Sequence, residues 1–194
     1  MNQIYQRYGK RVLDLILVFS VLILLSWLIL LILLCYCASI EFPILFKQLR
    51  IGKDRVPFTM WKFRTLSEHE DMPLQERRFR LGDFLRVTNL DELPQFWNVL
   101  TGEMSIVGPR PLPAEYGQFF SGTQHDRHRV RPGITGYAQV YGKNSISWEQ
   151  KFKLDLQYIT QISFRTDLII LLKTITLVLS MKRDVSLSEE KFEG

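Results

Sequence analysis

The feature that most constrains this chain is an uncharged apolar run near its N-terminus. Residues 15–38 are 24 successive residues without a formal charge, and Leu, Ile and Val dominate them. A helix of that length reaches about 36 Å, which matches the hydrocarbon core of a bilayer. The run is longer than the apolar part of a secretory signal and is followed by no clear small-residue cleavage site. The sequence therefore predicts a segment that stays in a membrane.

The charges that flank this run favour a helix that bends back over one that crosses. Lys and Arg lie on both sides, at positions 7, 10 and 11 and at positions 47, 50, 53 and 55. Because such residues stay in the cytoplasm, a re-entrant helix keeps both flanks on the correct side. The middle of the run reads Leu25-Ser26-Trp27 without a proline, so we expect a break near Ser26 and keep a straight span as the alternative. Asp14 is expected to pair with Arg11 or a later cation, or to lie at the interface.

The composition excludes several function classes. Hydrophobic residues make up 46% and charged residues 23% of the 194 residues, which fits neither a disordered chain nor a multi-span transporter. The balance of 25 Lys and Arg against 20 Asp and Glu is mildly basic, which suits anionic lipid or a phosphorylated substrate. The sequence has no zinc-ligand spacing, P-loop, dinucleotide-binding glycine motif or serine-hydrolase elbow, and we expect no nucleic-acid partner. His125 and His128 are expected on a solvated helix face.

Residues 44–50 and 56–65 are β-rich segments around a turn, which predicts a hairpin. A period of two places Lys62 and Arg64 on one face, as part of either a solvated or lipid-facing surface or a phosphate site. A second apolar stretch, 168–181, has helical spacing interrupted by charges and fits an interfacial helix or a core helix.

These patterns together predict the fold class. We expect an α+β protein that is mainly helical, with a membrane-embedded re-entrant helix at the N-terminus, a small β-hairpin and amphipathic interfacial helices around a compact cytosolic domain. The expected division places the membrane-embedded helix in residues 1–40 and the cytosolic catalytic domain with its interfacial helices in residues 41–194, as parts of one unit.

A carboxylate pair, Asp91 and Glu92, precedes an apolar helical pattern that ends at residues 101–102. Pro94 is excluded from a helix interior, so the pair is expected in the first helical turn. Asn89 and Glu92 fit a capping box, which would make the pair structural. Alternatively, one carboxylate can attack while the other holds a cation, because adjacent helical residues point in different directions.

Three loops rich in Gly or Pro each display a cation. Arg110 lies in 104–113, Arg131 in 129–136 and Lys143 in 141–145. Rigid loops of this kind present donors to phosphate with little loss of entropy. Together with Lys62, Arg64 and the carboxylate pair, they predict a site for phosphate and a metal ion.

Five motifs occur in a fixed order: KRxxD (10–14), FxxWKFRT (58–65), LDELPQ (90–95), GPRP (108–111) and VRPGITG (130–136). In this order they resemble the monotopic phosphoglycosyl transferases, the bacterial sugar transferase family, over residues 8–194. Two positions depart from the family pattern. Trp27 follows Ser26 where members often carry proline, and Lys143 stands where many carry arginine, which retains the charge but loses the bidentate fork.

The resemblance implies an enzyme at the cytoplasmic face of the bacterial inner membrane. It would transfer a phospho-sugar from a UDP-sugar to undecaprenyl phosphate and release UMP. Asp91 would be the nucleophile that forms a phosphosugar ester, and Glu92 together with Asp91 would hold Mg²⁺. The substrate-binding residues expected from the family positions and the loops are Lys62, Arg64, Arg86, Arg110, Arg131 and Lys143.

The identity of the sugar and the partners stay expectations at this point. The short chain and its closing residues 190–194 resemble small members that use N-acetylated sugars, and hexose-1-phosphate transfer, of glucose or galactose, is the alternative. A non-catalytic membrane adaptor with basic loops on anionic lipid is the rival from another class. The expected partners are the UDP-sugar, undecaprenyl phosphate and membrane lipid, and a homodimer stays open.

Overall fold

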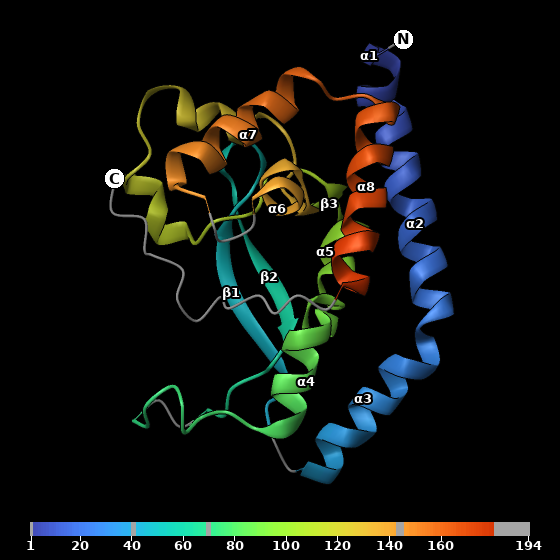
Figure 1. Ribbon diagram of the computed structural model, residues 1–194, viewed down its shortest axis with the longest axis vertical. Coiled ribbons are helices and arrows are strands. Elements are labelled where there is room, and N and C mark those ends of the chain that lie inside the picture. The colour runs from blue at the N-terminus through green and yellow to red at the C-terminus, as the bar shows by residue number, and fades with distance from the viewer. Residues whose placement is uncertain (1, 40–41, 69–70, 143–145, 181–194) are drawn as a thin grey trace.

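The computed structural model describes residues 2–39, 42–68, 71–142 and 146–180. Helices predominate over two small sheets, as expected (Figure 1). The α-helices are α1 (Asn2–Ile4), α2 (Lys10–Leu24), α3 (Ser26–Ser39), α4 (Arg80–Thr88), α5 (Gln95–Thr101), α6 (Tyr137–Tyr141), α7 (Trp148–Thr160) and α8 (Phe164–Leu179). A π-helical turn spans Tyr5–Gly9, and 3-10 turns span Lys53–Arg55, Leu90–Glu92, Ala114–Gln118 and Gly122–Arg129.

The predicted hairpin is confirmed. Strands β1 (Leu45–Ile51) and β2 (Pro57–Phe63) pair antiparallel, with Phe46 opposite Lys62 and Arg50 opposite Phe58. A second, parallel pair joins β3 (Ser105–Val107) to β4 (Gly133–Thr135). The hairpin therefore presents Lys62 close to the end of β2, at the edge of the region that holds the carboxylate pair.

The N-terminal apolar run forms two helices rather than one. No single described helix is both long and apolar enough to cross a bilayer, whereas the segments Tyr5–Leu24 and Ser26–Ser39, bent by 60°, together have the required length and composition. The Ser26 hydroxyl donates to the carbonyl of Ile23 at 2.9 Å, a bond that bends helices. The break expected near Ser26 is thus confirmed in position without a proline.

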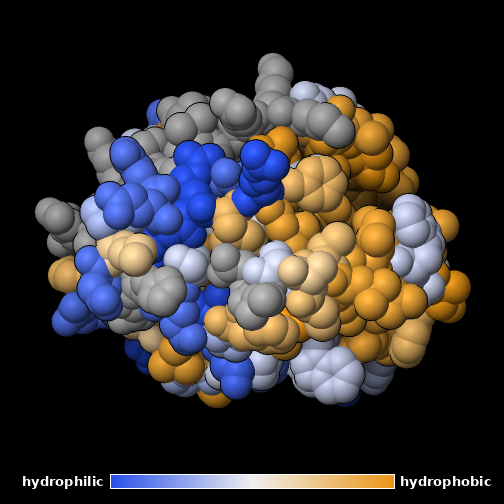
Figure 2. Space-filling view, turned by 90° about the horizontal axis from the view of Figure 1, so that it is seen from below, coloured by the Kyte–Doolittle hydropathy of each residue, from blue (hydrophilic) through white to orange (hydrophobic). Residues whose placement is uncertain are grey.

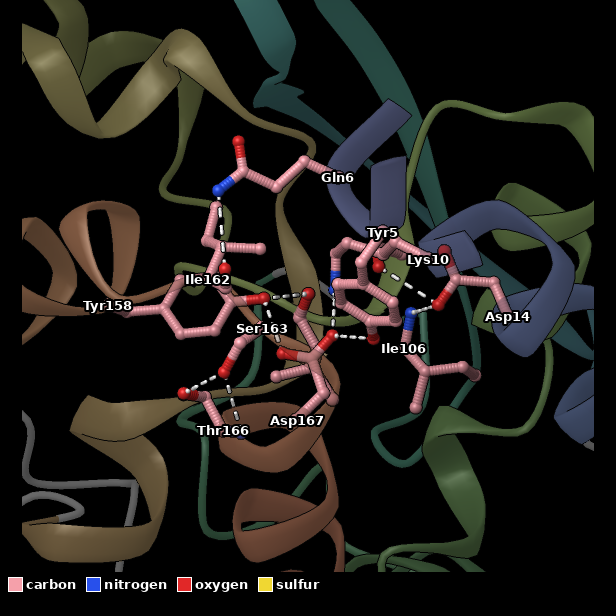
Figure 3. A network of polar contacts seen from close by, with 12 residues as sticks. Tyr5, Gln6, Lys10, Asp14, Ile106, Tyr158, Ile162, Ser163, Thr166 and Asp167 are labelled. Atoms are coloured by element: carbon pink, nitrogen blue, oxygen red, sulfur yellow. Dashed lines mark hydrogen bonds and ion pairs between the residues drawn. The ribbon is translucent and has the colours of Figure 1, made fainter. Parts of the chain in front are cut away.

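Asp14 on α2 corrects an expectation. It is buried and forms no ion pair with Arg11 or with a later cation of the described residues, and its Oδ1 accepts bonds from the Ser105 hydroxyl and the Ile106 amide at 3.0 and 2.9 Å. Arg11 instead donates to the carbonyls of Val99 and Leu100. These contacts fix α2 to β3 and α5, and the bond between Asp14 and Ile106 is drawn in Figure 3.

Helix α8 has a buried face and an apolar exposed face. Ile170 is fully buried in the main core with Val18 and Met104, whereas Leu172 and Ile175 are more than half exposed. The described part of the second apolar stretch is therefore a core helix with an exposed apolar side, and its interfacial role stays a prediction. Figure 2 shows hydrophobic residues gathered on one side of the molecule, the side on which Figure 1 places α2 and α3. A patch of this extent marks an interaction surface.

Candidate active site

The carboxylate pair lies in a single 3-10 turn between two helices. Helix α4 ends at Asn89, whose φ of 57° is left-handed, and its backbone N–H bonds back to the Arg86 carbonyl. The turn Leu90–Glu92 follows, and α5 begins only after Pro94. The expected capping box is wrong, because Asn89 closes α4 and its side chain makes no capping bond to the turn. A capping box therefore does not explain the presence of the Asp91–Glu92 pair.

Lys62 bridges the two carboxylates. Its Nζ lies 2.6 Å from Glu92 Oε1 and 3.8 Å from Asp91 Oδ2. The ammonium group arrives from β2, so the hairpin positions the cation against a turn that is about 30 residues further along the chain. This arrangement neutralises Glu92 more closely than Asp91 and leaves the two carboxylates in unlike surroundings.

The surroundings shift the two pKa values in opposite directions. Burial raises the pKa of Asp91 to about 6, an effect that Lys62 opposes and the Glu92 charge reinforces. Burial would also raise the pKa of Glu92, but the charges of Lys62 and Arg110 and the hydrogen bonds from Lys62 and Gln95 hold it below its ordinary value. Two adjacent carboxylates with divergent pKa values are typical of a division of chemical roles.

The pair opens on a cavity of about 890 Å³. Its wall contains seven cationic side chains, those of Lys47, Arg50, Lys62, Arg64, Arg77, Arg86 and Arg110. Asp91, Glu92 and Glu68 are the acidic residues of the same wall. A concave site of this size and charge suits a ligand with several phosphate oxygens.

Four of the predicted substrate-binding cations meet at this cavity: Lys62, Arg64, Arg86 and Arg110. Arg86 donates to the Thr65 hydroxyl at 2.7 Å, and Arg64 donates to the Pro43 carbonyl at 2.8 Å. The backbone carbonyl of Arg64 also accepts a hydrogen bond from the Tyr36 hydroxyl, which ties the cavity rim to α3. These bonds orient the guanidinium groups before a ligand arrives.

The other two predicted cations are not brought to the cavity. Arg131 is exposed, and its Nε donates to the Gly102 carbonyl beyond the end of α5, so its expected place in the site is wrong. The rigid loop that carries it turns this side chain outward. Lys143 lies outside the described residues.

One of the two histidines, His128, also differs from expectation. His128 is buried against Phe120 rather than solvated, and burial together with the Arg127 charge lowers its pKa to about 4. A neutral imidazole fits this apolar contact. The polar stretch around it gave no sign of a buried position, because the 3-10 turn Gly122–Arg129 buries Arg127 and His128 while Arg129 stays exposed.

Sequence reasoning missed two residues of the site. Arg50 lines the cavity and donates to the Pro111 carbonyl at 3.0 Å, although in the sequence it only contributes to the basic flank. Gln95 is buried and bonds to Glu92. The available signal for Arg50 was the alternation of residues along β1. The hairpin register places Arg50 and Gln48 on the same face of the sheet as Lys62 of β2.

The donor set is compatible with Mg²⁺ but not with a protein-only metal cage. Among the described residues, no group of three or more His, Cys, Asp or Glu side chains could hold a metal ion. Mg²⁺ is commonly held by one or two carboxylates that act together with substrate phosphates. Asp91 and Glu92, hard oxygen donors at the wall of a cationic cavity, fit that mode.

A second cavity, of about 530 Å³, adjoins the first and shares Asn89, Glu92 and Arg110 with it. Most of its wall is apolar, and Val21, Leu25 and Val178 of α2, the helix break and α8 contribute to it. The site therefore joins a cationic cavity to an apolar one.

A carboxylate pair between a cationic cavity and an apolar cavity suits an enzyme that transfers a phosphoryl group. The sequence profile of the family described as bacterial sugar transferase matches residues 5–181, and the chain belongs to this family. It is accordingly a phosphoglycosyl transferase, and the adaptor alternative is excluded.

Three relatives illustrate the similarity. The chain is 43% identical over 160 residues to the uncharacterized sugar transferase EpsL of Bacillus subtilis, covering 78% of this chain and 79% of that protein. It is 40% identical over 185 residues to an Escherichia coli protein named UDP-glucose:undecaprenyl-phosphate glucose-1-phosphate transferase, covering 87% and 40%. It is 38% identical over 156 residues to the galactosyl transferase CpsE of Streptococcus agalactiae, covering 71% and 35%. The chain thus spans about two-fifths of the length of the second relative and about a third of the third.

Proposed function

We propose that this protein transfers a hexose-1-phosphate from a UDP-sugar to undecaprenyl phosphate and releases UMP. The observation that carries the proposal is the Asp91–Glu92 pair, with its unlike pKa values, at the junction of a cationic and an apolar cavity. The names of the relatives, which specify glucose-1-phosphate or galactosyl transfer, support the class of substrates. These names favour glucose or galactose over the N-acetylated sugar that was expected from the short chain and its closing residues.

In the first step an Asp91 oxygen attacks the β-phosphorus of the UDP-sugar. The bond from that phosphorus to the bridging oxygen breaks, and the electron pair leaves on UMP. A phosphosugar ester of Asp91 results. The pKa of about 6 keeps Asp91 ionised at neutral pH, while Lys62 and Arg110 offset the repulsion between the carboxylates and the diphosphate.

In the second step an oxygen of undecaprenyl phosphate attacks the same phosphorus. The bond to the Asp91 oxygen breaks, which frees the carboxylate and yields a sugar-diphospho-lipid. The apolar cavity beside Glu92 gives the acceptor a path from the helices α2 and α8 to the site. One site can thereby serve a soluble donor and a lipid acceptor in turn.

Asp91 and Glu92 are the residues that would hold Mg²⁺ together with the substrate phosphates. When bound, the ion would neutralise phosphate charge and stabilise the charge that develops on the leaving UMP. Arg86 and Arg64, already oriented by bonds to Thr65 and Pro43, supply further charge at the same wall.

The test of the reaction is an incubation of the full chain with undecaprenyl phosphate, Mg²⁺ and a panel of UDP-glucose, UDP-galactose and UDP-N-acetylglucosamine. We expect UMP rather than UDP as the released nucleotide, with a hexose donor used best. Release of UDP would indicate glycosyl transfer and contradict the proposal. Preference for the N-acetylated donor would keep the reaction but replace the sugar.

We place the protein at the cytoplasmic face of the inner membrane, with the bent helices α2 and α3 dipping into one leaflet. The apolar surface of α2, α3 and α8 and the 60° bend support this arrangement. Labelling of Asn2→Cys and Gly194→Cys in a chain with Cys35→Ala and Cys37→Ala tests it, because both native cysteines are exposed. Protection of both engineered cysteines from an impermeant reagent in intact cells is expected. Labelling of the first alone would establish a straight span.

A further inference from the structure

The second cavity has a polar end that the proposed reaction does not yet use. Its wall contains Gln139 of α6, Asp155 of α7 and Arg127 of the turn Gly122–Arg129, which together form this polar end. Asp155 is only 2% exposed, and its Oδ2 accepts two bonds from Arg127, at 2.6 and 3.1 Å. Polar groups at the end of an apolar cavity commonly fix the orientation of a ligand.

Three buried atoms of this polar end have no partner in the described part of the chain. They are the second carboxylate oxygen of Asp155, Oδ1, and both amide atoms of Gln139, Oε1 and Nε2. Buried polar atoms are nearly always hydrogen-bonded, because an unpaired one loses its bond to water and gains nothing in return. Because Gln139 and Asp155 belong to the wall of this cavity, a ligand bound in it can supply the partner of these atoms.

The chemistry of these atoms selects the kind of ligand. A carboxylate oxygen repels phosphate, and an isoprenoid chain would leave all three atoms unsatisfied. A hydroxyl group both donates and accepts, so it can donate to Asp155 and exchange bonds with the Gln139 amide. The polar end therefore suits a neutral group that carries several hydroxyls.

A hydrogen-bonded path fixes this end relative to the reaction site. The Nη2 of Arg127 bonds both to Asp155 Oδ2 and, at 2.7 Å, to the carbonyl of Arg110. Arg110 and Glu92 belong to the walls of both cavities. A sugar joined to a phosphate beside Arg110 thus lies next to the polar end.

We propose that Gln139 and Asp155 form the subsite that binds the hydroxyls of the transferred sugar and sets the preference between sugars. The proposal rests on the function proposed above and adds the residues that distinguish one donor from another. The nucleotide occupies the cationic cavity, and the sugar reaches past Arg110 into the second one. Loss of a bond to one hydroxyl then changes the ranking of epimeric donors, since a site built around hydrogen bonds discriminates against analogues that cannot form them.

The test uses Gln139→Leu in the full chain, with kcat/KM for UMP release measured for UDP-glucose, UDP-galactose and UDP-N-acetylglucosamine. We expect the ratio between the best donor and its epimer to change by about tenfold or more, while inhibition by UMP changes less than about twofold. Gln161→Leu is the matched control, because Gln161 is exposed and contacts the Tyr137 hydroxyl outside both cavities. The control is expected to leave the ratio unchanged.

Gln139→Glu provides a second variant if Gln139→Leu fails to fold, since it keeps the shape and replaces the donor. An unchanged ratio of donors in a folded variant would overturn the subsite while leaving the proposed reaction intact. Equal weakening of UMP binding and of every donor would assign the polar end to the nucleotide and also overturn it. Failure of the unaltered chain to release UMP from any donor would overturn both proposals.

Discussion

Asp91 and Asp167 are both buried aspartates that contact a lysine, yet their surroundings differ in one decisive respect. Asp167 is 0% exposed and has a full set of partners, since its Oδ2 accepts from the Tyr5 hydroxyl at 2.6 Å and Lys10 at 2.7 Å, and its Oδ1 accepts from the Tyr158 hydroxyl at 2.9 Å (Figure 3). Asp91 is 9% exposed, lies 3.8 Å from Lys62 and faces a cavity.

The difference separates a structural carboxylate from a reactive one. Asp167 uses its charge to hold the start of α8 against the N-terminal residues, and every oxygen is satisfied within the protein. Asp91 has Lys62 at 3.8 Å, the charge of Arg86 and a hydrogen bond from its own backbone amide, but no close ion pair, and its pKa is raised by burial, so its carboxylate can take up a ligand from the cavity. The predictions below test this contrast in order of decreasing effect on turnover.

Asp91→Asn is expected to lower kcat by about a thousandfold or more, because an amide keeps the shape of the side chain but cannot form the phosphosugar ester. UMP release measured on purified, folded protein checks this result. Thermal unfolding should stay close to that of the unaltered chain. Turnover near the original rate would remove Asp91 from the chemistry.

Glu92→Gln is expected to lower kcat/KM by about a hundredfold, since it removes a negative oxygen donor and the close partner of Lys62. A titration with Mg²⁺ is the measurement, and higher concentrations should restore part of the activity. If the dependence on Mg²⁺ does not change, the metal ligands lie elsewhere.

Lys62→Met is expected to lower kcat/KM by about tenfold to a hundredfold and to shift its pH profile. In the unaltered chain kcat/KM should fall below about pH 6 as Asp91 becomes protonated. The Lys62 charge lowers the pKa of Asp91, so its removal raises that pKa and moves the acid limb to higher pH. A limb that stays in place or moves to lower pH would contradict the coupling between the two residues.

Arg110→Lys is expected to lower kcat/KM by about tenfold although the charge remains. A lysine cannot present a planar pair of donors to phosphate oxygens. Steady-state kinetics at varied UDP-sugar concentration measure the effect. An unaltered kcat/KM would limit Arg110 to its backbone bond with Arg127.

Asp167→Asn is expected to change kcat by less than about twofold but to lower the free energy of unfolding by about 2–4 kcal/mol, because Lys10 loses its charged partner in a buried place. Thermal unfolding compared directly with Asp91→Asn gives the matched pair. A large loss of kcat with unchanged stability would reverse the roles assigned to the two aspartates.

Local sequence patterns were sufficient to predict those parts of the fold that depend on residues close together in the chain. Alternation predicted the hairpin, and the mid-run Ser26 predicted the bend, because strand faces and helix breaks depend on nearby residues. The cations of the motifs at 58–65 and 108–111 were correctly expected beside the carboxylate pair.

Contacts between distant segments were beyond such patterns. Asp14 bonds to Ser105 and Ile106, 91 and 92 residues away, and nothing near Asp14 in the sequence indicates those partners. The predicted positions of Arg131 and His128 were wrong for the same reason, since the packing of their loops decides whether a side chain faces the site, the solvent or the core. The domain division and the roles of the individual site residues stay predictions.

The central claim is that Asp91 carries the sugar phosphate between donor and acceptor. The most direct measurement is mass spectrometry of the full chain incubated with Mg²⁺ and the preferred UDP-sugar in the absence of undecaprenyl phosphate. We predict one equivalent of UMP and a mass increase of one sugar phosphate on the peptide that contains Asp91, removed when the acceptor is added and absent in Asp91→Asn. UMP release that requires the acceptor from the start, with no modified peptide, would contradict the claim.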